Sequence, residues 1–314
     1  MAAGIDSLML LDTPSLYFRA YYGVPDSITA ADGTPVNAIR GLLDFMARLI
    51  RDYRPTRVVA AMDADWRPQW RVDALASYKA HRVAADGGDQ TPDPLAVQVP
   101  IIEEVLAALG IAQVGVAGYE ADDVIGTLSE QAQCPVDIVT GDRDLFQLVR
   151  DDKPVRVIYT ARGVGSATPW DEAAVTDKYG IPGRLYAEFA TLRGDPSDGL
   201  PGVAGIGEKT AAALVTRFGT VEELVEAAAA GDDKGFPAGA RAKVIASADY
   251  LEVAPVVVRV ACDVPLPPYD DRLRPEPRDP RALVALSDRW ALDSALNRLL
   301  AAIASATGAQ ATAE

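Results

Sequence analysis

Residues 7–12 read SLMLLD, a short apolar run that ends in an aspartate. Two later runs have the same form, RVVAAMD at 57–63 and PVDIVTGDRD at 135–144. Segments with helical periodicity separate them, among them VNAIRGLLDFMARLI at 36–50 and VPIIEEVLAALG at 99–110. Strands that alternate with helices form βαβ units. The sequence therefore predicts an α/β fold with a mainly parallel sheet flanked by helices.

The aspartates that end these runs stand where α/β proteins bind ligands. The carboxyl ends of parallel strands share one edge of the sheet, and ligands bind beyond that edge. We therefore expect Asp12, Asp63 and Asp142 to converge there. The stretch GYEADDVIGT at 118–127 begins a further helix with three acidic residues. An acidic first turn is also explained by the helix dipole alone, so this stretch gains meaning only together with the others.

Composition excludes several classes of protein. The chain has 314 residues, of which 49% are hydrophobic, enough for a substantial core. Cys134 and Cys262 are far apart, which fits a reducing cytosol and no disulfide framework. The N-terminus lacks a signal-peptide pattern, and no apolar run approaches the length of a membrane span. We expect a soluble, cytoplasmic protein with no membrane partner.

The net charge of −15 at first disfavours a nucleic-acid partner. This objection loses force if many of the carboxylates belong to one cluster that metal ions neutralise. The chemistry of the acidic motifs therefore decides the matter.

The alternation of strands and helices extends over residues 1–170. Within this region, residues 66–95 interrupt the pattern, because their first half is basic and their second half is rich in Gly, Pro and Asp. We expect a partly helical, mobile insertion that projects over the edge of the sheet.

Short helices dominate residues 171–304. We expect one helix to begin with Thr168 as its N-cap, and a terminal helix around Ala282–Ala304. The small, polar residues 305–314 are expected to form a disordered tail.

The stretch GVAGIGEKTAAALV at 202–215 resembles a phosphate-binding loop, but Glu208 separates Gly207 from Lys209. A Walker motif needs the lysine directly after the last glycine. A helix–hairpin–helix element fits better, since glycines let the backbone approach a phosphate and the amides of the next helix start receive it. An ordinary glycine-rich turn between helices remains the alternative.

Acidic pairs recur at the strand ends, at the helix start and just ahead of the glycine-rich element. No single pair is specific, since acidic turns are common, but their joint placement is hard to obtain by chance. Nine carboxylates make up this set: Asp12, Asp63, Glu120, Asp122, Asp123, Asp142, Asp144, Asp195 and Asp198.

With these motifs the chain resembles the bacterial 5′-nucleases, also called 5′–3′ exonucleases or flap endonucleases, and the N-terminal domain of many bacterial DNA polymerase I proteins. The resemblance runs in the family's order over about residues 8–220 and thins after about 250. It implies a PIN-like nuclease core, a helical arch at about 66–95 and a helix–three-turn–helix module at about 185–250. The matching stretches are LLDTPSLYFRAYY, VVAAMDAD, SYKAHR, GYEADDVIGTL, TGDRDLFQLV, TPWDEAAVTDKYGI and GDPSDGLPGVAGIGEKTAAAL.

Two positions depart from the family's pattern. Thr13 stands where the family often has glycine, and Gly199 stands where asparagine commonly follows the second aspartate of the GDxSD motif. Neither departure removes a carboxylate, so we expect an active enzyme. No polymerase domain follows, so we expect the protein to act alone and as a monomer.

The resemblance implies two or more divalent ions, and hard oxygen ligands suit Mg²⁺ or Mn²⁺. It assigns the first ion mainly to Asp12, Asp63, Glu120, Asp122 and Asp142. It assigns the second mainly to Asp123, Asp144, Asp195 and Asp198.

The resemblance also implies how the substrate is held. Lys79 and Arg82 match arch residues that meet the scissile phosphate, and Arg19 matches another cation of the active site. The substrates implied are branched or 5′-ended DNA, with RNA–DNA hybrids as a further class. The residues expected at the duplex DNA are Gly202, Gly205, Gly207, Lys209 and Thr210, with K⁺ held by backbone carbonyls near Val203 and Ile206.

Three other functions stay open at this point. A phosphatase for small substrates would not need the hairpin element or the basic insertion. A non-catalytic binder of branched DNA would not need nine carboxylates. A PIN-type ribonuclease would prefer RNA flaps to DNA flaps, so a comparison of the two substrates separates it from a DNA nuclease.

Overall fold

The computed structural model describes residues 6–84, 87–88, 90–231 and 233–308. Its centre is a six-stranded sheet with the strand order β3-β2-β1-β4-β5-β6. The first five strands in this order pair in parallel, and β6 is antiparallel to β5. The expected mainly parallel α/β sheet is confirmed. The strands are β1 Leu8–Asp12, β2 Arg57–Ala61, β3 Ala112–Val114, β4 Val136–Thr140, β5 Val155–Tyr159 and β6 Thr168–Trp170.

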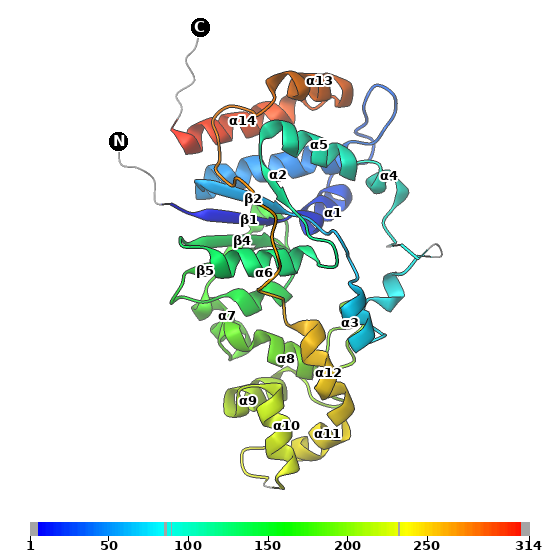
Figure 1. Ribbon diagram of the computed structural model, residues 1–314, viewed down its shortest axis with the longest axis vertical. Coiled ribbons are helices and arrows are strands. Elements are labelled where there is room, and N and C mark those ends of the chain that lie inside the picture. The colour runs from blue at the N-terminus through cyan, green and yellow to red at the C-terminus, as the bar shows by residue number, and fades with distance from the viewer. Residues whose placement is uncertain (1–5, 85–86, 89, 232, 309–314) are drawn as a thin grey trace.

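Helices cover both faces of the sheet, and this explains why β1 is apolar at nearly every position (Figure 1). Successive side chains of a strand point to opposite faces. Leu8 and Leu10 accordingly belong to the core on one face, and Met9 and Leu11 to the core on the other. A strand buried on both faces reads as a continuous hydrophobic run.

One face is covered by α1 Thr13–Gly23, α2 Asn37–Tyr53, α5 Val99–Leu109, α13 Pro280–Trp290 and α14 Asp293–Thr307. The chain therefore returns to the α/β core at its end, because α14 packs along α2. This differs from the expectation of one helical region through residue 304. Ala291 takes a left-handed conformation and divides the expected terminal helix into two. The expected disordered tail is helical up to Thr307, and residues 309–314 lie outside the described part.

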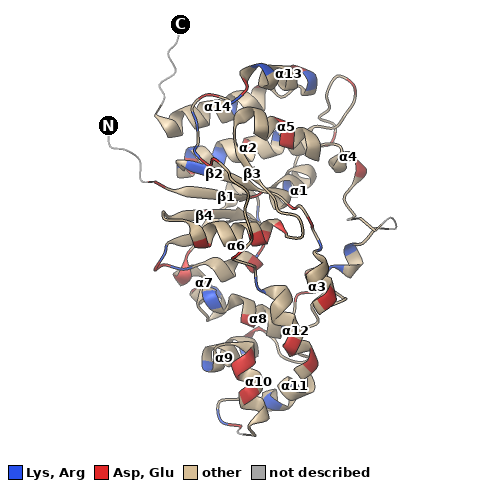
Figure 2. Cartoon of the chain, in the orientation of Figure 1, with Lys and Arg blue, Asp and Glu red and all other residues tan. Residues whose placement is uncertain are grey.

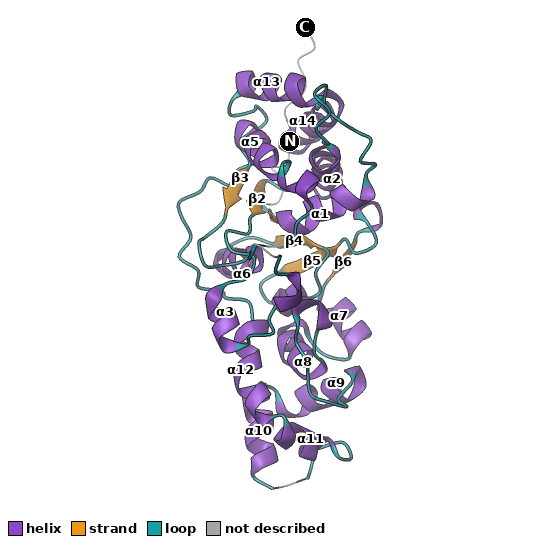
Figure 3. Cartoon of the chain, turned by 90° about the vertical axis from the view of Figure 1, so that its right-hand side faces the viewer, coloured by secondary structure: helices purple, strands orange, loops and turns teal. Residues whose placement is uncertain are grey.

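The other face is covered by α6 Ala121–Gln131, while α7 Glu172–Tyr179 and α8 Tyr186–Arg193 lead away from the sheet (Figure 3). The side chain of Asp171, not Thr168, caps α7 by accepting from Ala174 N at 2.9 Å. Thr168 instead belongs to the edge strand β6. The far end of the molecule consists of α9 Glu208–Phe218, α10 Val221–Ala229, α11 Ala240–Ala246 and α12 Ala248–Val258 (Figure 1).

The insertion 66–95 contains α3 Gln69–Ala74, a short 3₁₀ helix η1 at Ala80–Arg82 and, at its end, α4 Asp93–Ala96. Its partly helical character is confirmed, and residues 85, 86 and 89 lie outside the described part. We call residues 66–84 the arch base; it contacts α12 through α3. The remaining 3₁₀ helices are η2 Asp144–Leu148, η3 Val164–Ser166, η4 Gly183–Leu185 and η5 Pro196–Asp198.

Over the described ranges, every helix is too short or too polar to span a membrane.

Candidate active site

Carboxylates from three strand ends and one helix start line a single cavity of about 240 Å³. Asp12 is the last residue of β1, and Asp63 and Asp142 follow β2 and β4 by two residues each. The convergence expected from the parallel topology is confirmed. Figure 2 shows the acidic start of α6 beside the ends of these strands. The predicted residues that line the cavity are Asp12, Asp63, Lys79, Arg82, Glu120, Asp122 and Asp142.

Hydrogen bonds hold the carboxylates of this cavity in place. Asp12 caps α1 by accepting from Ser15 N at 3.2 Å, and its other oxygen accepts from Thr140 Oγ1 at 2.5 Å. Thr140 Oγ1 in turn accepts from Asp142 N at 2.8 Å, so the ends of β1 and β4 are tied together. Asp63 accepts from Ala121 N at 2.8 Å and ties the end of β2 to the start of α6.

The crowding of like charges shows in the pKa values of these groups. Burial raises the pKa of Asp12 to about 7; its hydrogen bond from Thr140 lowers that pKa, and the nearby charges of Asp63 and Asp142 raise it. Burial, followed by the charges of neighbouring carboxylates, raises the pKa of Asp122 well above its ordinary value. The cavity thus collects negative charge that calls for a positive partner.

A second acidic group lies next to the first. Asp144 begins η2. Asp195 and Asp198 lie on the loop ahead of the glycine-rich turn at 202–207, which leads into α9 and which we call the hairpin. Burial and then the charges of Asp142, Asp198 and Asp195 raise the pKa of Asp144 well above its ordinary value. The Asp142 charge also raises the pKa values of Asp12 and Asp198, so Asp142 lies between the two groups.

The donor set fits divalent metal ions by its chemistry. Carboxylate oxygens are the hard ligands that Mg²⁺ and Mn²⁺ prefer. Asp144 Oδ1 is buried and has no hydrogen-bond partner among the described residues, as expected for an atom that binds a metal ion. Among the described residues, no group of three or more Asp, Glu, His or Cys side chains lies close enough together to hold one metal ion as the structure stands. The fit therefore rests on charge and donor type.

Asp123 does not belong to either acidic group, which corrects its expected role as a ligand. Its side chain is 0% exposed, and both of its oxygens accept hydrogen bonds from Arg71. Ala261 N and Glu120 N donate to it as well, at 2.9 and 3.2 Å. Adjacent helical residues are rotated by about 100° around the axis. Asp122 therefore faces the cavity while Asp123 faces the arch base, in a capping box with Glu120.

The predicted cations lie at or beside the cavity. Lys79 Nζ donates to Glu120 Oε1, and the backbone N of Lys79 donates to Asp198 O at 2.9 Å. Burial is the largest single effect and lowers the pKa of Lys79, but Glu120, Tyr78 and Asp198 together outweigh it and hold that pKa well above its ordinary value. Arg19 lies against Gly141 and donates to Ala161 O at 3.0 Å, so it borders the site without lining the cavity.

The glycines of the hairpin have different structural roles. Gly202 has a φ of 68°, and a Cβ there would lie 2.5 Å from Gly194 N, so close packing of two backbone segments requires glycine. Gly205 also has a positive φ, of 74°. Gly207 caps α9 in extended backbone and faces open space, with Lys209 and Thr210 in the first turn that follows.

Val203 and Ile206, the residues expected to hold K⁺, have buried side chains. Ile206 N donates to Val203 O at 2.9 Å, which folds the backbone into a tight turn between them.

Arg71 was missed as part of the site. The motif WRVD that contains it carries no recognisable spacing to Asp123, which lies 52 positions further along the chain. The side chains of Arg71 and Asp123 meet only because the arch base packs against the start of α6.

A mainly parallel sheet whose strand ends gather carboxylates next to a basic arch base, with a helical hairpin beyond, is the arrangement of a nuclease. The sequence matches the family model described as 5′-3′ exonuclease, N-terminal resolvase-like domain, over residues 7–180. It matches the 5′-3′ exonuclease C-terminal SAM fold over residues 181–281. The chain belongs to the 5′-3′ exonuclease family and is an enzyme of that class.

Known relatives agree with this membership. A 5′-3′ exonuclease of Streptomyces coelicolor is 59% identical over 298 residues, which are 93% of this chain and 98% of the relative. DNA polymerase I of Mycobacterium tuberculosis is 40% identical over 96% of this chain, but the match covers 32% of that protein. The bacteriophage T5 D15 flap endonuclease, in a complex with DNA and metal ions, has a TM-score of 0.61 at 16% identity. That match covers 96% of this chain and 99% of the phage protein.

Proposed function

We propose that this 5′-nuclease is metal-dependent and structure-specific, and that it hydrolyses phosphodiesters of DNA near free 5′ ends and at the base of 5′ flaps. The observation that carries the proposal is the cavity in which strand-end carboxylates meet Lys79 and Arg82 of the arch base. A cavity with negative carboxylates and positive side chains can bind both metal ions and a phosphate group.

The residues proposed to hold the first Mg²⁺ or Mn²⁺ ion are Asp12, Asp63, Glu120, Asp122 and Asp142, and those for the second are Asp144, Asp195 and Asp198. Two divalent ions in such a site would supply an activated water and stabilise the attacking and leaving oxygens. Asp142 is proposed as the ligand shared by both ions, because its charge acts on members of both acidic groups.

The cations of the arch base would bind and orient the phosphate. Lys79 reaches the cavity with a positive charge that the neighbouring carboxylates maintain. Arg82 lines the same cavity and offers a planar set of donors that matches phosphate oxygens. Arg19, beside Gly141, would bind a phosphate at the border of the site.

The hairpin would anchor the duplex at a distance from the chemistry. The amides at the start of α9 are open to a phosphate at Gly207, and Lys209 and Thr210 follow in the first turn. Gly202 and Gly205 would let the turn approach the DNA backbone, and K⁺ at the carbonyls near Val203 and Ile206 would bridge to a duplex phosphate. The phage T5 structure, which shares the fold, is described with DNA and metal ions, and this supports a DNA substrate and divalent ions for the site.

The decisive test is cleavage of a 5′-labelled flap DNA with Mg²⁺, with Mn²⁺ and with EDTA. We expect short products released from the flap with either metal and none with EDTA. An identical RNA flap and an RNA–DNA hybrid test the wider substrate range, and nitrophenyl phosphate tests a small-substrate phosphatase. Cleavage of nitrophenyl phosphate without any cleavage of flap DNA would refute the proposal. We further propose that the enzyme acts on chromosomal DNA as a monomer. Its place of action would then be the cytoplasm.

A further inference from the structure

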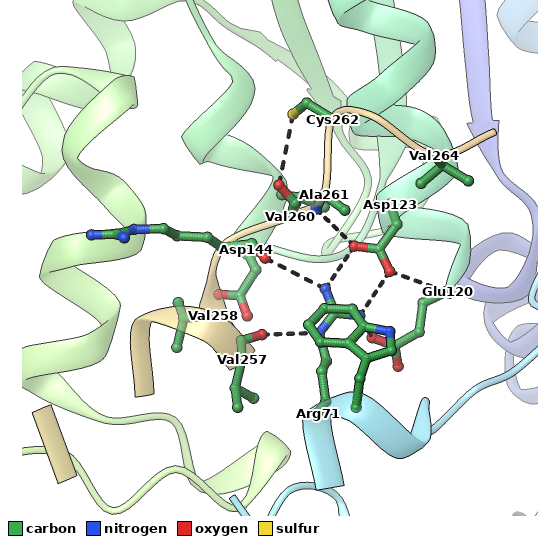
Figure 4. A network of polar contacts seen from close by, with 12 residues as sticks. Arg71, Glu120, Asp123, Asp144, Val257, Val258, Val260, Ala261, Cys262 and Val264 are labelled. Carbon is green, nitrogen blue, oxygen red and sulfur yellow. Dashed lines mark hydrogen bonds and ion pairs between the residues drawn. The ribbon is translucent and has the colours of Figure 1, made fainter. Parts of the chain in front are cut away.

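A buried arginine of the arch base, Arg71, bonds to the start of α6 (Figure 4). The side chain of Arg71, on α3, is only 3% exposed. Its two terminal nitrogens donate to the two oxygens of Asp123 at 2.6 and 2.8 Å, and one of them also donates to Glu120 Oε2 at 2.6 Å. Its Nε donates to the carbonyl oxygen of Val257 at 3.1 Å.

These bonds connect three parts of the chain that are distant in sequence. Arg71 comes from the arch base, Asp123 from the first turn of α6, and Val257 from the end of α12. Asp123 also accepts from Ala261 N, which fastens the segment after α12 to the same point. The ring of Trp70 packs against the guanidinium, with 4.3 Å between the ring centroid and Arg71 Cζ, and covers the cluster on one side.

The two oxygens of Glu120 have different partners. Oε2 accepts from Arg71 and from the hydroxyl of Tyr78 at 2.7 Å, both of which belong to the arch base. Oε1 meets Lys79, which lines the cavity together with Glu120. One oxygen is therefore held from behind while the other is presented to the cavity.

Building on the proposed function, we propose that Arg71 is a positioning residue that presents Glu120 to the metal site only when the arch base is seated on α6. Arg71 itself does not line the cavity. Outer-shell partners of this kind orient a ligating carboxylate, and their loss commonly costs about 10–100-fold in metal affinity.

Arginine suits this role because of its shape. Its planar group carries five donors in a fixed fork, so it can serve both oxygens of Asp123, one oxygen of Glu120 and the Val257 carbonyl together. Lysine at position 71 would keep the charge, but its three donors on a flexible stem cannot reproduce this fork.

The competing explanation is a purely structural ion pair, and a charge-balanced variant separates the two. Arg71→Gln together with Asp123→Asn removes one positive and one negative charge, so the net charge beside Glu120 is unchanged. A change in metal affinity then reports the orientation of Glu120. The matched control is Arg259→Gln together with Glu188→Gln. It removes an ion pair next to the end of α12, and the side chains of this pair contact neither Glu120 nor the cavity. Arg71 reaches Arg259 only through the backbone oxygen, which the substitution keeps.

The primary measurement is Mn²⁺ binding to the DNA-free protein, followed by electron paramagnetic resonance of the free ion. We expect the Arg71 double variant to bind Mn²⁺ about 10–100-fold more weakly than the wild type, and the control double variant to stay within about twofold. At saturating Mn²⁺, the Arg71 double variant should recover part of its single-turnover cleavage of flap DNA. Wild-type Mn²⁺ affinity in a folded Arg71 double variant would overturn the inference.

Arg71→Lys provides a second test that does not depend on the double variant folding. It keeps the charge of the cluster, and we expect Mn²⁺ affinity between those of the wild type and the double variant. Wild-type affinity in Arg71→Lys would show that charge alone suffices and that the fork does not position Glu120. Failure of the wild type itself to bind Mn²⁺ and cleave flap DNA would refute the proposed function instead, so the two failures are distinguishable.

Discussion

The contact between the arch base and the loop ahead of the hairpin gives a prediction at Gly199. This residue has a φ of 72°, and a Cβ added to it would lie 2.1 Å from the carbonyl oxygen of Ser77. A carbon and a carbonyl oxygen normally stay roughly 3.3 Å or more apart. The variant Gly199→Asn must therefore push Ser77 away by more than about 1 Å. Lys79, two residues later, donates its backbone N–H to Asp198 O and would move with Ser77.

The cost can be estimated in two parts. Loss of the hydrogen bond between Lys79 N and Asp198 O removes about 0.5–1.5 kcal/mol of stability, and crowding of a packed contact adds about 1–3 kcal/mol. The effect on chemistry should be larger, because a displacement of about 1 Å in a positioned group can reduce the rate about 10²-fold. We therefore expect the single-turnover rate of Gly199→Asn to fall about 100-fold while its affinity for flap DNA changes little.

Gly180→Asn is the matched control. Gly180 has nearly the same backbone conformation, with a φ of 74°, but a Cβ there would meet no atom within 4 Å. Asparagine tolerates this left-handed conformation, so the control isolates the collision with Ser77 from the backbone preference. Cleavage by quenched flow and unfolding by urea would be measured for both variants. Equal rates and equal stabilities in Gly199→Asn and Gly180→Asn would refute the seating of the arch base on this loop.

Three further predictions test the cations, the shared ligand and the anchor. Lys79→Ala should reduce single-turnover cleavage about 10²–10³-fold with little loss of flap affinity, and near-normal chemistry would leave Lys79 as a surface charge. Asp142→Asn should abolish turnover in Mn²⁺, yet in EDTA it should bind flap DNA at least as tightly as the wild type, because one repelling carboxylate is gone. Added metal should raise the melting temperature of this variant less than that of the wild type, and cleavage near the wild-type rate would exclude Asp142 as a shared ligand. Gly207→Val should fold, since nothing lies within 4 Å, but bind duplex substrates more weakly and with a shallower salt dependence; unchanged binding would exclude α9 as the anchor.

The position of the first acidic group follows from local sequence and one topological rule. Asp12, Asp63 and Asp142 each end or closely follow an apolar run that reads as a strand. Since the strands are parallel, these ends must share one edge of the sheet. Neither step requires knowledge of which distant side chains meet, and for this reason the prediction from sequence is correct.

The errors arise where a distant partner decides the outcome. Asp122 and Asp123 are alike in sequence, and only the presence of Arg71 behind α6 separates a cavity residue from a buried ion pair. The helix α14 reads as a continuation of the helical region, yet its partner α2 lies about 250 residues earlier, as the ion pair between Arg298 and Asp44 shows. Thr168 resembles an N-cap, but pairing with β5 places it in an edge strand.

Lys79 shows how the arch base and both acidic groups depend on one another. Its φ of 47° is left-handed, a conformation that costs a non-glycine residue roughly 1–2 kcal/mol. The surrounding contacts hold it there, since its backbone N–H is bonded to Asp198 of the second acidic group and its side chain to Glu120 of the first. Strain of this kind persists only where neighbouring structure determines it. Arg71 holds the other oxygen of Glu120, so a displaced arch base would release Lys79 and Glu120 together. The positive and negative sides of the cavity thus depend on the same contacts of the arch base. A variant that displaces the arch base is therefore expected to weaken both the proposed metal site and the proposed phosphate-binding cation.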